Sequence, residues 1–326
     1  MRFLAALLLI LLCPLTLQAE CVGQNLIAVL PPDQRAALQI AADVPFARGN
    51  LWHATKGAQT ITLIGTFHLD DPRHDATVAA LTATLLAATT LLVEAGPAEE
   101  KALKSHVAAH PDLLINATGL TLPEALPAAD WLRLSDALRA RGIPPVFAAR
   151  MQPWYIASIL AIPACQFAGA ATMNGLDRRL ITLANAQGVS VAALEPFDTI
   201  FAIFDSFTAA DQLAMLIQTL DASAADDDMA TTLADSYFAG QSRLFWEFSK
   251  LHLLTLPGID PAAAAREFAL VEAALINRRN QAWIAPITTA AADGPLVVAF
   301  GALHLPGENG VLNLLARDGW TITALP

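Results

Sequence analysis

The chain contains five short runs of apolar residues that end at turn-forming residues, with helical patterns between them. Such runs are typical of buried strands in a parallel sheet that is covered on both faces. The predicted strands are residues 60–65, 90–94, 145–149, 189–195 and 295–301. Apolar residues at spacings of three and four predict helices at residues 75–88, 97–109, 122–141, 177–187 and 261–287.

Strands that alternate with helices predict an α/β fold with a mainly parallel sheet flanked by helices. Residues 197–256 contain no convincing strand and have helical patterning throughout. We interpret this stretch as a helical insertion or cap on the sheet. Because no low-complexity linker divides the chain, we expect residues 20–326 to form a single domain.

The N-terminus accounts for part of the high mean hydropathy of +0.47. Arg2 precedes an apolar run over residues 3–17, which predicts a secretory signal peptide cleaved near Ala19. Residues 151–176 carry no charge either, but prolines and amides make them a poor membrane span. Alanine-rich helices explain much of the remaining apolar excess. We therefore expect a periplasmic or secreted protein with no integral membrane segment in the mature chain.

Charge and cysteine content narrow the function further. Without the leader the chain has 18 basic and 30 acidic side chains, a net charge of about −12. Such a surface repels phosphate backbones, so nucleic acid is not an expected partner. Cys13 lies in the leader, which leaves Cys21 and Cys165 in an oxidising compartment. We expect these two to form a disulfide; the alternative is two unpaired buried thiols, because sequence does not give their separation.

One motif follows two of the predicted strands. Residues 65–68 and 301–304 both read Gly-x-x-His, ending in His68 and His304. Ligands and catalytic groups collect beyond the carboxyl ends of parallel strands, and glycine there lets a ligand approach the backbone. One such histidine is more often structural than functional. Two of them, at opposite ends of the chain, indicate a functional site.

Two other predicted strands end in glutamate, at Glu94 and Glu195. A carboxylate at the end of a buried strand is a helix cap, or it needs a cation or a metal to offset its desolvation. Two histidines and two carboxylates support two chemistries. One is a divalent metal that activates water, and the other is a histidine base oriented by a carboxylate. Whether the four strand ends converge depends on the strand order.

Other polar residues near these strands have two interpretations each. In the loop after His68, we expect His74 and Asp75 to belong to the start of the next helix, while Asp70 stays open as a further metal or substrate contact. Arg279 and Asn280 precede the last strand, where arginine fixes a carboxylate or an oxyanion or lies on a solvated face. The chain has no GxSxG, SxxK, HExxH or CxxC motif, which disfavours serine hydrolases and zincins of the common kinds.

The order of these motifs resembles the TraB/PrgY/GumN family. The matching residues are Leu51-Trp52, the two Gly-x-x-His motifs, Val93-Glu94, Gly175-Leu176-Asp177, Leu194-Glu195, Arg279-Asn280 with Trp283, Leu305-Pro306-Gly307, and Gly310-Val311 with Leu314-Leu315. The family is similar to the Tiki metalloproteases and, more distantly, to erythromycin esterases and haem-binding ChaN proteins. The resemblance implies a mixed α/β core of two related halves.

The resemblance also implies roles for individual residues. His68, Glu94 and His304 match the shared site and would hold Mn²⁺, Co²⁺ or Zn²⁺, while Arg279, Asn280 and Glu195 match its remaining polar positions. The leading hypothesis is an exported metal-dependent hydrolase, peptidase-like or amidase-like, acting on a peptide or small-molecule substrate. The alternatives are a metal-independent esterase with a histidine base and a non-enzymatic protein that binds peptide or haem in the same cleft.

Overall fold

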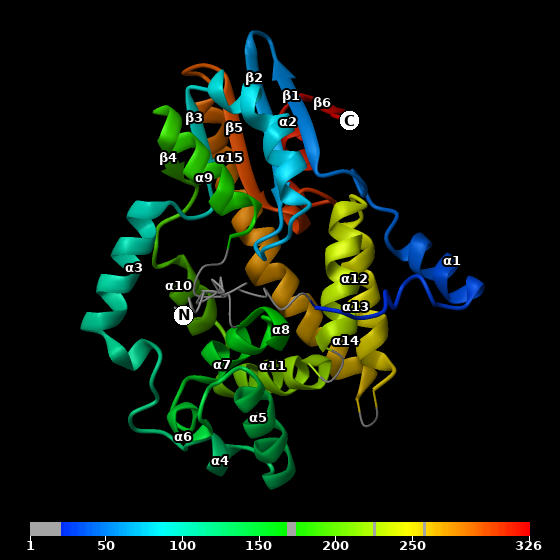
Figure 1. Cartoon of the computed structure of the whole chain (residues 1–326), viewed down its shortest axis with the longest axis vertical. Coiled ribbons are helices and arrows are strands. Elements are labelled where there is room, and N and C mark those ends of the chain that lie inside the picture. Colours follow the sequence, from blue (N-terminus) through cyan, green and yellow to red (C-terminus); the bar gives the residue numbers. More distant parts are fainter. Residues whose placement is uncertain (1–20, 168–173, 224–225, 257–258) are drawn as a thin grey trace, which may run out of the picture.

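The computed structural model describes residues 21–167, 174–223, 226–256 and 259–326. The predicted signal peptide at residues 1–19 lies outside these ranges. In the described part of the chain, one six-stranded sheet has the order β4-β3-β5-β2-β1-β6 (Figure 1). Its strands are β1 (Leu51–Lys56), β2 (Gln59–Thr66), β3 (Thr90–Val93), β4 (Ser190–Ala193), β5 (Leu296–Gly301) and β6 (Thr321–Ala324).

The sheet is mixed and mostly parallel. Strands β4, β3, β5 and β2 are parallel neighbours, whereas β1 pairs antiparallel with both β2 and β6. The four parallel strands are those predicted from their apolar runs. The two antiparallel strands, β1 and the edge strand β6, were not predicted, because β6 is mostly exposed and β1 alternates between buried and partly exposed positions.

Helices α2 and α9 cover one face of this sheet, α15 and α16 cover the other, and further helices lie below it (Figure 1). The helices of the described residues are α1 (Pro32–Ala41), α2 (His74–Leu86), α3 (Pro97–Ala109), α4 (Leu122–Ala125), α5 (Ala128–Ala140), α6 (Pro145–Ala148), α7 (Pro153–Leu160), α8 (Ala164–Phe167), α9 (Leu176–Gln187), α10 (Thr199–Asp205), α11 (Ala209–Ala222), α12 (Asp226–Phe238), α13 (Ser242–Leu254), α14 (Pro261–Val271), α15 (Arg278–Ala290) and α16 (Val311–Arg317). The α/β fold class is confirmed.

Strand β5 shows why the parallel strands are apolar at every position. Val297 and Ala299 pack on one side with α2 and α9, while Val298 and Phe300 pack on the other side with α15 and α16. Successive side chains of a strand point to opposite faces, so a sheet covered on both faces needs apolar residues throughout. Full burial of one such side chain stabilises the fold by about 1.5–3 kcal/mol.

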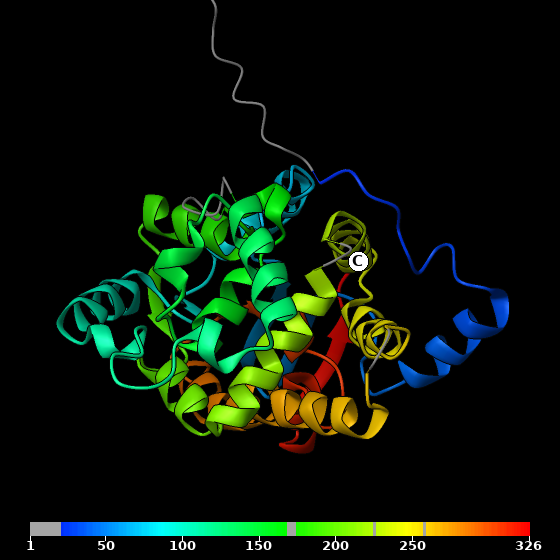
Figure 2. The ribbon, with the colours of Figure 1, turned by 90° about the horizontal axis from the view of Figure 1, so that it is seen from below.

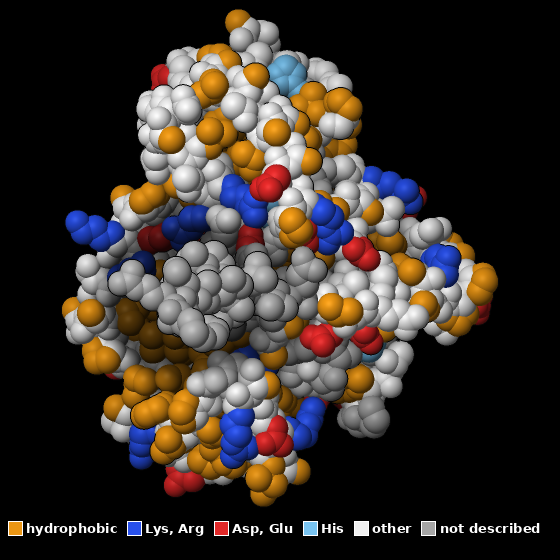
Figure 3. Space-filling view, in the orientation of Figure 1, with side chains coloured by type: hydrophobic (Ala, Val, Ile, Leu, Met, Phe, Trp, Pro, Cys, Tyr) orange, Lys and Arg blue, Asp and Glu red, His pale blue; other side chains and the backbone are white. Residues whose placement is uncertain are grey.

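Two predicted elements differ from the structure. Residues 145–149 do not form a strand, because Pro145 begins the short helix α6 and leaves Val146 and Phe147 exposed. Figure 3 shows hydrophobic side chains scattered over the surface of this lower, helical part. The helix predicted over residues 122–141 is two helices, α4 and α5, because Pro127 cannot continue the first one.

The long helix predicted over residues 261–287 is present, with one irregularity. Helix α14 continues through a π-helical segment, η4 (Glu272–Asn277), into α15. π-helical turns are rare and occur frequently at functional sites. This segment ends at Asn277, two residues before Arg279.

Residues 197–256 contain helices α10 to α13 and no strand among their described residues, as predicted. Viewed from below, the helices lie in front of the sheet (Figure 2). In the described part of the chain, no single helix has the length and hydropathy needed to cross a membrane. Helices α10 and α11 meet that test only as a pair, and they are bent by 105° from each other.

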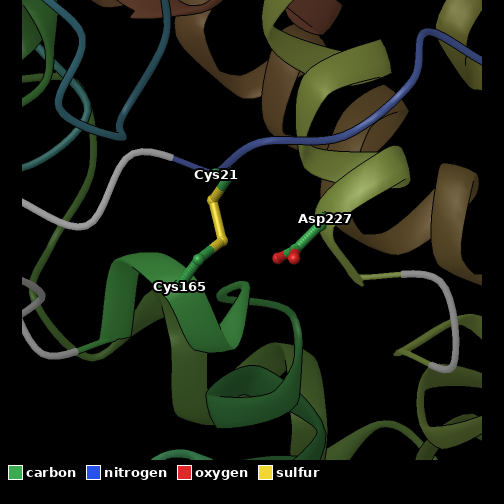
Figure 4. A group of neighbouring side chains, drawn as sticks. All are labelled: Cys21, Cys165 and Asp227. Carbon is green, nitrogen blue, oxygen red and sulfur yellow. A yellow bond between two sulfur atoms is a disulfide. The ribbon is translucent and has the colours of Figure 1, made fainter.

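The predicted disulfide is present. Cys21, ahead of α1, is bonded to Cys165 of α8 across 144 residues of sequence (Figure 4). The bond ties the start of the described chain to the helical part below the sheet, and it is consistent with an oxidising compartment.

Candidate active site

The strand order brings the four predicted strand ends to one edge of the sheet. Strands β2 and β5 are adjacent and pair Thr66 with Gly301, so the two Gly-x-x-His motifs leave the sheet side by side. Strand β3 lies next to β5 and delivers Glu94, and β4 lies beyond it and delivers Glu195. The convergence that depended on strand order is therefore present.

Gly301 lies at the centre of these side chains. A Cβ atom at this position would be 3.2 Å from His68 Nε2, 3.4 Å from Glu94 Oε1 and 3.7 Å from His304 Cδ2. The backbone N–H of Gly301 also donates a 2.7 Å hydrogen bond to Glu94 Oε1. Glycine here leaves space between the two histidines and the glutamate that any other side chain would fill.

His68 is held by an aspartate that the sequence reasoning did not assign to the site. Its Nδ1 lies 3.1 Å from Oδ1 of Asp177, the second residue of α9, and because a carboxylate only accepts, the imidazole donates this bond. Its Nε2 lies 3.9 Å from Glu94 Oε1. Burial lowers the pKa of His68, but the Asp177 hydrogen bond and the charges of Glu94 and Asp177 outweigh it and raise the pKa to about 9. The ring, with 48% of its side chain exposed, is charged near neutral pH.

Replacing Asp177 by asparagine is expected to lower the pKa of His68 from about 9 toward its ordinary 6.5. A raised folded-state pKa stabilises the fold fully below pH 6.5, and that stability is lost as pH rises through about 9. The variant should therefore lose most stability near pH 6 and none above the His68 pKa. NMR titration of metal-free protein and urea unfolding at several pH values measure both effects.

Asp75→Asn is the matched control, because Asp75 is exposed and forms an ion pair with Arg179 rather than with His68. An unchanged His68 titration in Asp177→Asn would show that Asp177 does not control this histidine.

Glu94 is an ionised, mostly buried carboxylate. One oxygen accepts the Gly301 N–H, and the other lies 2.6 Å from Arg279 Nη2. Burial raises the pKa of Glu94, but the surrounding histidine and arginine side chains and the Gly301 hydrogen bond outweigh it and lower the pKa to about 2. Near neutral pH His304 is uncharged, so the positive charges that face Glu94 are those of His68 and Arg279.

Arg279 joins the two glutamates. Its guanidinium donates two bonds to Glu195, at 2.6 Å and 3.0 Å, in addition to the bond to Glu94. Trp283, one turn further along α15, donates its indole N–H to Glu195 at 3.0 Å. Burial lowers the pKa of Arg279, but the two carboxylates outweigh it and raise the pKa. The Arg279 guanidinium therefore stays charged and holds Glu94 and Glu195 in a Glu–Arg–Glu arrangement at the strand ends.

His304 is buried and neutral. Asn280 donates its amide N–H groups to the carbonyl oxygens of His304 and Asn309, so its Oδ1 is the atom that lies 2.6 Å from His304 Nδ1. Nδ1 must then carry the proton, and Nε2 presents a lone pair 3.4 Å from Arg279 Nη1. Burial, together with the charges of Arg279 and His68, lowers the pKa of His304 to about 3 despite Glu94.

The charged side chains in the loop after His68 form ion pairs within the protein, so they are not free to act as ligands. Asp70 and Asp75 both form ion pairs with Arg179 of α9, and Asp71 forms an ion pair with Arg73. His74 is buried at the start of α2 with its Nε2 against the Leu69 carbonyl. These contacts fix the loop that carries His68, and they agree with a structural interpretation of His74 and Asp75.

The expected ligands His68, Glu94 and His304 are neighbours, but their ligand atoms do not all lie within 4.8 Å of one another. Within the described residues, the one group of three metal-ligand types whose atoms lie within 4.8 Å of one another is Cys21, Cys165 and Asp227. Its sulfur atoms are bonded to each other (Figure 4). At the strand ends, the Arg279 guanidinium lies beside both Glu94 and His304 Nε2.

Comparison with known proteins identifies the family. A model of the TraB/PrgY/gumN family matches residues 50–324. The chain belongs to the TraB/PrgY/gumN family. No curated protein and no solved structure gives a match. The match covers every polar residue described above at the strand ends.

Two site residues of this TraB/PrgY/gumN family member, Asp177 and Trp283, belong to its sequence motif, but the sequence assigned neither a role. Asp177 orients His68, and Trp283 donates to Glu195. The available signal for Asp177 was an acid in the first turn of a helix that follows a glycine. Pattern alone favours a helix-dipole interpretation for such a residue. What brings Asp177 to His68 is the contact between the start of α9 and the chain just after β2, where the Leu176 N–H donates to the Phe67 carbonyl.

Proposed function

We propose that this protein is an exported hydrolase that cleaves an amide or ester bond with water and uses a divalent cation held by His68, Glu94 and His304. One observation carries the proposal. Both Gly-x-x-His histidines are fixed through Nδ1, by Asp177 and by Asn280, so that Nε2 of each faces the strand-end groups, where a cation would take the place of the Arg279 N–H that lies 3.4 Å from His304 Nε2. Histidines that bind metals are oriented in this way by a second set of residues.

The protonation states at the site support the same proposal. Metal binding requires a neutral imidazole and an ionised carboxylate, which are the forms that His304 and Glu94 have near neutral pH. His68 would give up its proton to the solvent on binding the ion. A bound divalent cation lowers the pKa of water and polarises a carbonyl group.

The chain's own residues would orient and stabilise the reacting groups. Asp177 holds the His68 ring, Asn280 holds the His304 ring, and Glu195 with Trp283 holds Arg279. The guanidinium of Arg279, which Glu195 holds in place, can stabilise the negative charge that develops on the substrate oxygen. Export is supported by the predicted leader and by the Cys21–Cys165 disulfide.

The second candidate is the metal-independent hydrolase. The specific observation in its favour is that Arg279 already supplies a positive charge to Glu94 and lies 3.4 Å from His304 Nε2. In that mechanism a histidine or carboxylate base takes the proton of the attacking water, and the guanidinium alone stabilises the oxyanion.

Removal of metal separates the two candidates. We expect chelator-treated protein to lose turnover of peptide and p-nitrophenyl ester substrates and to regain it with Mn²⁺, Co²⁺ or Zn²⁺ at one ion per chain. His68→Ala should lose both the ion and the turnover. His53→Ala is the control, because His53 lies on β1 and pairs with the edge strand β6. Elemental analysis and initial rates measure the two quantities.

Turnover that resists the chelator in protein without bound metal would overturn the proposed role of a cation and establish the histidine-base mechanism. Saturable binding of peptide or haem without turnover of any substrate, with or without added metal, would overturn the hydrolase and leave a binding protein.

A further inference from the structure

The helical insertion contacts the first Gly-x-x-His motif through one tyrosine. Tyr237 lies near the end of α12, and its buried hydroxyl group donates a 2.9 Å hydrogen bond to the carbonyl oxygen of Gly65, 172 residues away in sequence. Its ring stacks on that of Phe67, with the ring centroids 5.3 Å apart and the planes at 25°. The insertion therefore holds both the first residue of the motif and the residue that precedes His68.

Gly65 and Tyr237 are joined a second time through Asn50. The Gly65 N–H donates to the Asn50 carbonyl at 2.7 Å, and the Asn50 side-chain amide donates to the Tyr237 carbonyl at 2.6 Å. With the hydroxyl bond, these contacts form a closed ring of three hydrogen bonds that includes the N–H and the C=O of Gly65. Leaving a buried backbone group without a partner is unfavourable, so the ring determines where the Gly65 backbone lies.

Gly65 is also the point where the two Gly-x-x-His motifs touch. A Cβ atom at Gly65 would lie 2.9 Å from both Cα and Cβ of Ala302 and 2.6 Å from Cδ1 of Leu305. Ala302 belongs to the second motif, and Leu305 directly follows His304. The position of the Gly65 backbone therefore affects the turn that carries His68 and the contact of that turn with the second motif.

The hydroxyl group of Tyr237 is suited to holding this backbone and not to transferring a proton. Burial, and then the charge of Asp177, raise the pKa of Tyr237 above its ordinary value, so the hydroxyl keeps its proton near neutral pH. Its single donor hydrogen is used in the bond to Gly65. Tyr237 therefore acts through the backbone of the motif.

We infer that Tyr237 is a positioning residue that, through Gly65, determines where His68 lies relative to the other proposed ligands of the cation. This inference rests on the proposed function and adds a residue of the helical insertion to its site. Residues that orient the ligands of a metal, without binding it, change metal affinity or activity by roughly 10- to 100-fold when they are replaced.

Tyr237→Phe tests this role, because it removes the hydroxyl and keeps the ring that stacks on Phe67. We expect the dissociation constant for Mn²⁺, Co²⁺ or Zn²⁺, measured by calorimetry, to rise about tenfold. Turnover should fall at low ion concentration and recover as the ion concentration is raised, with KM for the substrate nearly unchanged. In metal-free protein, the NMR signals of the His68 ring should shift and broaden.

Two controls separate positioning from a general loss of stability. Tyr155→Phe makes the same chemical change on α7, where the ring lies beside Trp154. Ile156→Val removes a buried methylene group from the core formed by α5, α7 and α11, and it should lower stability about as much as one lost hydrogen bond. Neither variant should change the cation affinity or the NMR signals. If Tyr237→Phe fails to fold, Asn50→Ala removes the donor to the Tyr237 carbonyl and should change both quantities in the same direction.

The outcomes separate this inference from the proposed function. A cation dissociation constant within twofold of that of wild type, or unchanged His68 signals, would overturn the positioning role, and so would an equal loss of affinity in Ile156→Val. Altered His68 signals and weaker cation binding in Tyr237→Phe, with no turnover of any substrate by the wild type, would overturn the hydrolase and retain the positioning role. If the wild type binds no cation, the proposed cation is overturned and the His68 signals decide whether Tyr237 positions this histidine.

Discussion

Replacing His304 by alanine is expected to lower kcat/KM by at least about 10³-fold. General acid–base catalysis by one side chain contributes roughly 10²- to 10⁴-fold. His304 is neutral and buried, and its unprotonated Nε2 accepts from Arg279 Nη1 at 3.4 Å. Whether it binds a cation or takes a proton, that lone pair is the feature on which both candidate mechanisms depend. Initial rates with saturating metal, and again with chelator, measure the loss.

The stability of this variant must be measured with its activity. Removing the ring leaves Asn280 Oδ1 without its donor, at a cost of about 1–3 kcal/mol, so urea unfolding should show a lower but intact transition. His304→Gln restores a donor near Asn280 and should recover stability without recovering turnover. His110→Ala is the surface control, since His110 is exposed at the end of α3. Turnover within threefold of wild type in His304→Ala would remove this histidine from the mechanism.

The sequence was sufficient to predict the parallel strands because burial on both faces demands apolar residues at every position. Val297 and Phe300 satisfy that demand on opposite faces of one strand. It was insufficient for the antiparallel edge, where burial is partial, and for residues 145–149. There Val146 and Phe147 have strand-like composition, but they are exposed on a proline-initiated helix.

The candidate site shows the same division between local and long-range information. His68, Glu94, Glu195 and His304 could be chosen because each follows a buried strand, and the ends of parallel strands carry ligands. Their grouping required the strand order β4-β3-β5-β2, which no local pattern encodes. The role of Asp177 required the packing of α9 against the sheet, which is a tertiary contact.

Arg279 links the site to the stability of the fold, because its side chain and those of Glu94 and Glu195 are all less than 20% exposed. Arg279→Met should destabilise the protein by about 3–5 kcal/mol, since removing one partner of a buried ion pair leaves the other charges uncompensated. It should also abolish turnover. Arg279→Lys should rescue little of either, because one ammonium cannot replace the planar fork that contacts both glutamates.

The pH dependence identifies the cause of this loss. The folded-state pKa of Glu94 is lowered from 4.5 to about 2, so its ion pairing stabilises the wild type above pH 4.5 and that stability is lost as pH falls toward 2. The difference in unfolding free energy between wild type and Arg279→Met should therefore be greatest near pH 6–7 and shrink in acid. Arg317→Met is the control: its ion pair with Glu308 is 58% and 67% exposed. Such a pair contributes about 0–1 kcal/mol. Equal losses in the two variants, or a loss in Arg279→Met that is as large at pH 2 as at pH 7, would contradict the buried Glu–Arg–Glu arrangement as the source of stability.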